Sequence, residues 1–119
     1  MKKCIIVDDS KFMRKLIAEA LREHGYLIAG EADNGQDGID LYENIKPDFI
    51  TMDITMEGKN GITAIEEIKT KFPESKIIVI SALSETAIKI NDKNIKADAF
   101  LAKPFDKKEL IDLVDKILT

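Results

Sequence analysis

The chain has 119 residues with 18 basic and 22 acidic side chains, which gives a formal net charge of −4. This length suits one domain with one hydrophobic core, and the acidic balance argues against nucleic-acid binding. A single cysteine, Cys4, excludes an internal disulfide, and no apolar run is long enough to cross a bilayer or to act as a secretion signal. We therefore expect one cytoplasmic domain over residues 1–119, with no membrane insertion.

Short apolar runs alternate with helical patterns along the chain. The first run, Lys3–Val7, precedes a helix that carries Arg14 and Lys15 on its polar face. The apolar positions of that helix are Met13, Leu16, Ile17, Ala20 and Leu21. The later runs predict strands at about Leu27–Ala32, Phe49–Met52, Lys76–Ile80 and Ala99–Ala102. Most are rich in isoleucine and valine, which is typical of parallel strands covered on both faces.

Turn and capping residues support this alternation. Two Asn-Gly pairs, at 34–35 and 60–61, each precede a helical pattern, and Asp106 is placed to cap the last helix with Glu109 three residues later. The weakest predicted helix lies at 86–96, because asparagine and aspartate are poor helix formers. Together these units predict an α/β fold, a doubly wound, five-stranded parallel sheet with five helices.

Polar side chains stand where the predicted strands end. Asp8 and Asp9 follow the first strand, Asp53 the third, Ser81 the fourth and Lys103 the fifth. Because parallel sheets bind ligands outside the carboxyl ends of their strands, we expect these side chains to converge. Two neighbouring carboxylates repel each other by about 1 kcal/mol at 4 Å in water. A bound Mg²⁺ would relieve that repulsion, since an oxygen-only acidic cluster suits this ion.

The same set of side chains predicts phosphoryl-transfer chemistry. The transition state of that reaction needs charge neutralisation and positioning more than covalent work by the protein. Asp53 is the candidate nucleophile, because carboxylates form aspartyl-phosphates. Lys103 would offset the charge of the phosphate, and Ser81 would donate a hydrogen bond to one of its oxygens.

Four segments resemble the receiver domains of two-component response regulators, and the resemblance covers the full chain. They are IVDDS at 6–10, PDFITMDITM at 47–56, ISA at 80–82 and FLAKPF at 100–105. Two further segments, DDSKFMRK at 8–15 and GEADNGQDGIDLY at 30–42, resemble in particular the stand-alone, CheY-like chemotaxis regulators. The resemblance implies a flavodoxin/CheY-like sheet of order 2-1-3-4-5 and a single receiver domain with no output domain.

The resemblance also implies roles for individual residues. Asp53 would be the phosphoacceptor. The Mg²⁺ ligands would be Asp8, Asp9, Asp53 and the backbone carbonyl of Thr55. The family usually has proline where Glu57 stands, methionine where Lys59 stands and glycine where Lys96 stands.

A second set of residues would bind the phosphate and switch the protein. It comprises Ser81, Ala82, Lys103 and Phe100. Phe100 occupies a position that is often tyrosine in the family, so any switching role must come from its ring rather than from a hydroxyl. The Lys103–Pro104 peptide bond is implied to be cis.

The resemblance implies that the chain is a signalling switch rather than an enzyme, with only its own autophosphorylation and autodephosphorylation chemistry. Its partners would be a CheA-like histidine kinase and a downstream motor-switch or phosphatase protein. The chain would bind them as a monomer. A phosphorelay intermediate or a phosphate sink is an alternative. A Mg²⁺-dependent phosphatase would need an Asp-x-Asp motif and a substrate cap, and a flavodoxin-like redox carrier would need a Ser/Thr/Gly-rich phosphate loop after the first strand. The adjacent Asp8 and Asp9 match neither pattern.

Overall fold

A computed structural model describes residues 1–54, 61–84, 86 and 95–119. Its strands form one parallel sheet in the order β2-β1-β3-β4-β5, which confirms the predicted topology. The strands are β1 (Lys3–Val7), β2 (Leu27–Ala32), β3 (Phe49–Met52), β4 (Ile77–Ser81) and β5 (Ala99–Ala102). Four of them have the predicted bounds, and β4 begins and ends one residue later than predicted.

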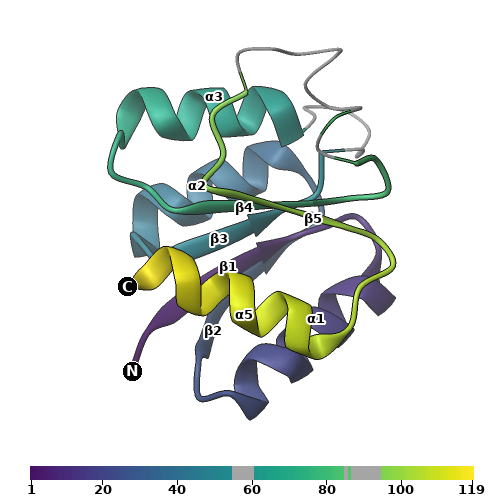
Figure 1. Ribbon diagram of the computed structural model, residues 1–119. Helices are drawn as coiled ribbons and strands as arrows, with labels where there is room; N and C mark the ends of the chain where they lie inside the picture. Colours follow the sequence, from purple (N-terminus) through teal and green to yellow (C-terminus); the bar gives the residue numbers. More distant parts are fainter. Residues whose placement is uncertain (55–60, 85, 87–94) are drawn as a thin grey trace.

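Helices cover both faces of the sheet. They are α1 (Lys11–Glu23), α2 (Gly35–Ile45), α3 (Gly61–Lys71) and α5 (Lys107–Leu118). The described ranges therefore hold four helices, whereas five were predicted. Most of the predicted fourth helix, at 86–96, lies outside those ranges. Figure 1 shows α1 and α5 on one face of the sheet and α2 and α3 on the other.

The core is divided between these two faces by the alternation of side chains along each strand. In β1, Ile5 and Val7 pack toward α2 and α3, whereas Cys4 and Ile6 pack toward α1 and α5. Burial raises the pKa of the Cys4 thiol to about 12. Cys4 is thus an inert core side chain, because the thiolate is the reactive form of cysteine.

The buried face of α1 is narrower than predicted. Its buried residues are Ile17, Ala18, Ala20 and Leu21, while Leu16 is 38% exposed and Phe12 is 70% exposed. Arg14, expected on the solvated face, has a side chain that is only 17% exposed. The first turn of α1 therefore does not follow the simple apolar stripe, because Arg14 contacts the Asp8 carbonyl and Glu31 there.

Helix starts are set by local hydrogen bonds. The Ser10 hydroxyl accepts from the Met13 amide at 3.1 Å and thereby begins α1 directly after the Asp8–Asp9 pair. The Asn34 side chain caps α2, and Asp106 forms the predicted capping box with Glu109.

Among the helices described, none combines the length and the apolar character needed to span a bilayer.

Candidate functional site

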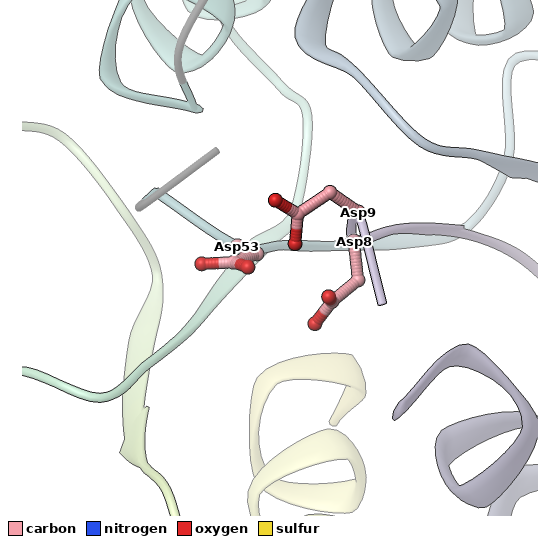
Figure 2. Close-up of side chains that lie close together, drawn as sticks. All are labelled: Asp8, Asp9 and Asp53. Carbon is pink, nitrogen blue, oxygen red and sulfur yellow. The ribbon is translucent and has the colours of Figure 1, made fainter. Parts of the chain in front are cut away.

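Three carboxylates meet at the carboxyl edge of the sheet. Asp8 and Asp9 follow β1, and Asp53 follows β3, so two neighbouring strands bring them together. One oxygen of each carboxylate lies within 4.8 Å of an oxygen of the other two. Figure 2 shows the three side chains grouped at the ends of their strands. The convergence expected from the strand ends is therefore present for this acidic set.

Asp8 is the most firmly held of the three. Its side chain is 1% exposed, its Oδ1 accepts from the Ser10 amide at 2.9 Å, and its Oδ2 accepts from Lys103 Nζ at 2.9 Å. Burial raises the pKa of the Asp8 carboxyl, and the hydrogen bonds from Ser10 and Lys103 oppose that rise. The negative charge of Asp53 adds to it. An additional cation beside Asp8 would therefore favour its ionised form.

Asp53 and Lys103 form the second contact of the site. The Asp53 side chain is 2% exposed, and its Oδ2 lies 3.5 Å from Lys103 Nζ. The Asp53 amide donates to the Val7 carbonyl at 2.9 Å, which holds the residue beside the end of β1. Lys103 thus contacts both buried carboxylates with a side chain that is 18% exposed.

Asp9 completes the set from the solvent side. It is exposed, whereas Asp8 and Asp53 are buried, so the cluster opens toward water at Asp9. Three carboxylates and a single ammonium leave negative charge uncompensated among these residues. Oxygen ligands with an open side suit Mg²⁺, which keeps several waters when it binds to proteins. The donor set of Asp8, Asp9 and Asp53 therefore fits this ion.

The predicted switch residues lie along β4 and β5. Ser81 is the last residue of β4, is 1% exposed, and accepts through its Oγ from the Leu83 amide at 3.1 Å. Ala82 is exposed in the loop that follows. Phe100, in β5, is partly buried against the core on the α2–α3 side. The Lys103–Pro104 peptide bond is cis.

Several positions named from the sequence lie outside the described residues. They are Thr55, Glu57 and Lys59 in the segment after Asp53. The assignment of the Thr55 carbonyl as a metal ligand therefore stays a prediction.

Two residues that support the site were not singled out from the sequence. Arg14 Nη1 donates to the Asp8 carbonyl at 2.6 Å, and Arg14 Nε lies 3.4 Å from Glu31 Oε1. Gly61 opens α3 against the backbone of Asp53 and Ile54. The sequence positions of Arg14 and Gly61 do not reveal such contacts, because the contacts depend on how α1 and α3 pack on the sheet.

Replacing Gly61 by alanine is expected to destabilise the protein by at least about 2 kcal/mol. An added Cβ would overlap the carbonyl oxygen of Asp53 and lie 2.6 Å from Cα of Ile54, and both are backbone atoms that cannot rotate away. Urea unfolding measures the decrease in the free energy of unfolding. The control is Gly25→Ala, where φ is +91° but no atom lies within 4 Å of the added Cβ. A Gly61 variant no less stable than the Gly25 variant would contradict the close approach.

The raised pKa of Asp8 predicts a pH effect on stability in the absence of metal. The native pKa is above the ordinary value of 3.8. Between that value and the native pKa, the folded chain binds more protons at this site than the unfolded chain. The contribution of Asp8 to the free energy of unfolding is therefore complete below the unfolded pKa and is lost as pH rises through the native pKa. Urea unfolding in EDTA, from about pH 4 to about pH 7, should show wild type losing stability relative to Asp8→Asn. A constant difference between the two proteins would count against the shift.

Comparison with known proteins agrees with this geometry. The response regulator receiver domain model matches residues 4–115. Protein CcdB of Bacillus subtilis is 41% identical over 99% of this chain and 98% of its own length. Chemotaxis protein CheY of Thermotoga maritima is 41% identical over 98% of this chain and 97% of its own length.

A solved structure is also closely similar. The CheX-CheY-BeF3-Mg complex from Borrelia burgdorferi contains a chain that superposes with a TM-score of 0.93 and 28% identity, covering 99% of this chain and 90% of that one. The family match spans nearly all of the sequence, and the relatives match over nearly their whole length. The chain therefore belongs to the response regulator receiver domain family.

Proposed function

We propose that this receiver domain is a phosphoacceptor response regulator that takes a phosphoryl group on Asp53 and thereby changes its affinity for a downstream protein. The observation that carries the proposal is the meeting of Asp8, Asp9, Asp53 and Lys103 at one edge of the sheet. Asp53 is buried beside the Asp8–Asp9 pair, and Lys103 contacts both Asp53 and Asp8. That setting suits a carboxylate that must attack phosphorus while a nearby cation offsets the negative charge of the incoming phosphoryl group.

In the proposed reaction, a carboxylate oxygen of Asp53 attacks the phosphorus of a phosphohistidine on a kinase. The new P–O bond forms an acyl phosphate on Asp53, and the P–N bond to the imidazole breaks as that nitrogen takes up a proton. Lys103, already 3.5 Å from Asp53 Oδ2, would pair with the added phosphate. Its bond to Asp8 at 2.9 Å keeps the ammonium at the site before the reaction.

Asp8, Asp9 and Asp53 are the residues that would hold Mg²⁺, with the Thr55 carbonyl as a further proposed ligand. When bound, the ion would neutralise charge on the phosphoryl group. The similar chain of Borrelia burgdorferi is described with Mg and BeF3, which supports the choice of ion. The protein contributes carboxylate oxygens from the ends of two neighbouring strands, with Asp8 and Asp9 after β1 and Asp53 after β3.

The proposed partners follow from the relatives. Matches to chemotaxis proteins CheY support a CheA-like histidine kinase as the phosphodonor, and chemotaxis or flagellar motor control as the setting. The proposed downstream partner is a motor-switch or phosphatase protein. We propose that the chain works as a monomeric switch and not as an enzyme with a substrate of its own.

Ser81→Ala is expected to separate phosphorylation from output. The hydroxyl of Ser81 now accepts from the Leu83 amide, and it can rotate toward a phosphate oxygen on Asp53. The variant should still be labelled on Asp53 but should lose most of the activation-dependent partner binding, because without the hydroxyl the phosphate no longer stabilises one conformation over the other.

The measurement is a pull-down from the native organism with protein treated with beryllofluoride and Mg²⁺, compared with untreated protein. Asp53→Asn is the control that cannot be activated. Proteins retained equally by treated and untreated wild type would contradict a switch. Rapid return of the phosphoryl group to a histidine on a partner would instead identify a phosphorelay intermediate.

A further inference from the structure

Arg14 joins the ends of two strands. Its Nη1 donates to the Asp8 carbonyl at 2.6 Å, and its Nε lies 3.4 Å from Glu31 Oε1. The Arg14 side chain is largely buried, whereas the neighbouring Lys15 is exposed. A guanidinium is a rigid planar fork and can hold two acceptors at once. Arg14 is therefore part of the sheet edge rather than of the solvated helix face.

The Asp8 carbonyl lies where the pairing of β1 with β2 stops. The Asp8 amide donates to the Ala32 carbonyl at 3.0 Å, and β2 ends at Ala32. In a continued parallel ladder, the next donor to Asp8 would be the amide of residue 34. Asn34 instead begins α2 as its N-cap. Arg14 supplies a donor at this point, so the partly buried carbonyl keeps a partner.

This hydrogen bond bears on Asp9 more than on Asp8. The Asp8 carboxylate is held separately, by the Ser10 amide and by Lys103. The Asp8 carbonyl belongs to the planar peptide that leads into Asp9, so holding its oxygen fixes the plane from which Asp9 projects. Asp9 itself is exposed. Its position in the acidic cluster therefore depends on the orientation of that peptide.

We propose that Arg14 is a positioning residue for the metal site: it fixes the Asp8–Asp9 peptide and so aims the Asp9 carboxylate, while Glu31 holds the guanidinium in place. The inference rests on the proposed function, in which Asp9 is a Mg²⁺ ligand. Outer residues that orient ligands commonly change metal affinity by about 10–100-fold when replaced.

The direction of the change in Mg²⁺ affinity distinguishes a positioning role of Arg14 from the effect of its charge alone. Arg14 is a cation near a site for a cation, so loss of its charge alone would strengthen Mg²⁺ binding. Loss of the hydrogen bond to Asp8 would weaken Mg²⁺ binding, because Asp9 would no longer be held in place. Arg14→Met removes both the charge and the hydrogen bond while keeping an unbranched side chain.

The test is a calorimetric titration of the unphosphorylated protein with Mg²⁺. We expect Arg14→Met to raise the dissociation constant of Mg²⁺ about tenfold. The matched control is Arg22→Met, which removes an exposed arginine from the same helix and should change that constant by less than about twofold. In labelling of Asp53 by acetyl phosphate, the Arg14 variant should need more Mg²⁺ but reach nearly the wild-type rate when Mg²⁺ is saturating.

An unchanged or lower dissociation constant in folded Arg14→Met would overturn the proposal, whatever happens to its melting temperature. If that variant does not fold, Glu31→Gln takes its place and should raise the constant about threefold, the size of one surface ion pair. Its control is Asp40→Asn, which removes the same charge from an exposed position on α2. An effect of Glu31→Gln no larger than that of Asp40→Asn would also overturn the proposal. Failure of wild type itself to bind Mg²⁺ and accept phosphate would instead overturn the proposed function.

Discussion

Replacement of Asp53 by asparagine is expected to reduce labelling by acetyl phosphate and Mg²⁺ to background. Asparagine has nearly the same shape as aspartate but lacks the carboxylate that attacks phosphorus, so the fold should persist while the reaction stops. Stability should not fall greatly, because the change also removes one of three mutually repelling carboxylates. Intact-protein mass spectrometry measures the label, and thermal unfolding checks the fold.

The control for this experiment is Asp48→Asn. Asp48 lies just before the opposite end of the same strand, β3, where its carboxylate accepts from the Lys3 amide. That variant should label as wild type does. A label that persists in Asp53→Asn and maps to another residue would show that the acceptor has been assigned wrongly.

Replacement of Asp9 by asparagine is expected to remove most of the thermal stabilisation that Mg²⁺ gives. At a Mg²⁺ concentration ten times its dissociation constant, binding stabilises wild type by about 1.4 kcal/mol, or about 5 °C in Tm for a domain of this size. Asp9 is the exposed member of the cluster, so its neutralisation should not harm the metal-free fold. Relief of carboxylate repulsion should leave the Tm in EDTA equal to or above that of wild type.

Melting curves of wild type, Asp9→Asn and Asp33→Asn, each in EDTA and in Mg²⁺, measure this effect. Asp33 is an exposed aspartate that directly follows β2, and it is not a member of the acidic cluster. Its variant therefore controls for the loss of one negative charge. A shift in Asp9→Asn as large as that in Asp33→Asn would exclude Asp9 as a metal ligand.

The strands were predictable because each is a short apolar run bounded by polar or turn residues. Four strands have the predicted bounds, and β4 moves by one residue to end on Ser81 rather than before it. The apolar runs predict strands well here because helices cover both sheet faces, so that β3 and β4 are buried at every position. The buried face of α1 was less predictable, since Leu16 fits the apolar period but is 38% exposed.

The residue content of the site was also predictable. Once the strands are parallel, Asp8, Asp9, Asp53 and Lys103 must all follow carboxyl ends on one sheet edge. The sequence by itself therefore determined which charged side chains meet. It could not determine that Lys103 would lie 2.9 Å from Asp8 and 3.5 Å from Asp53, because these contacts join residues far apart in the chain.

Only the tertiary structure decided how the two neighbouring aspartates differ. Asp8 is buried and Asp9 is exposed, although the sequence presents them as an equivalent pair. Side chains that follow one another at a strand end point in opposite directions, and burial of each depends on what packs there. Arg14 shows the same limit, since it matches a solvated helix position yet donates to the Asp8 carbonyl. Periodicity records which face of an element is apolar, whereas hydrogen bonds at a sheet edge depend on how closely separate elements approach.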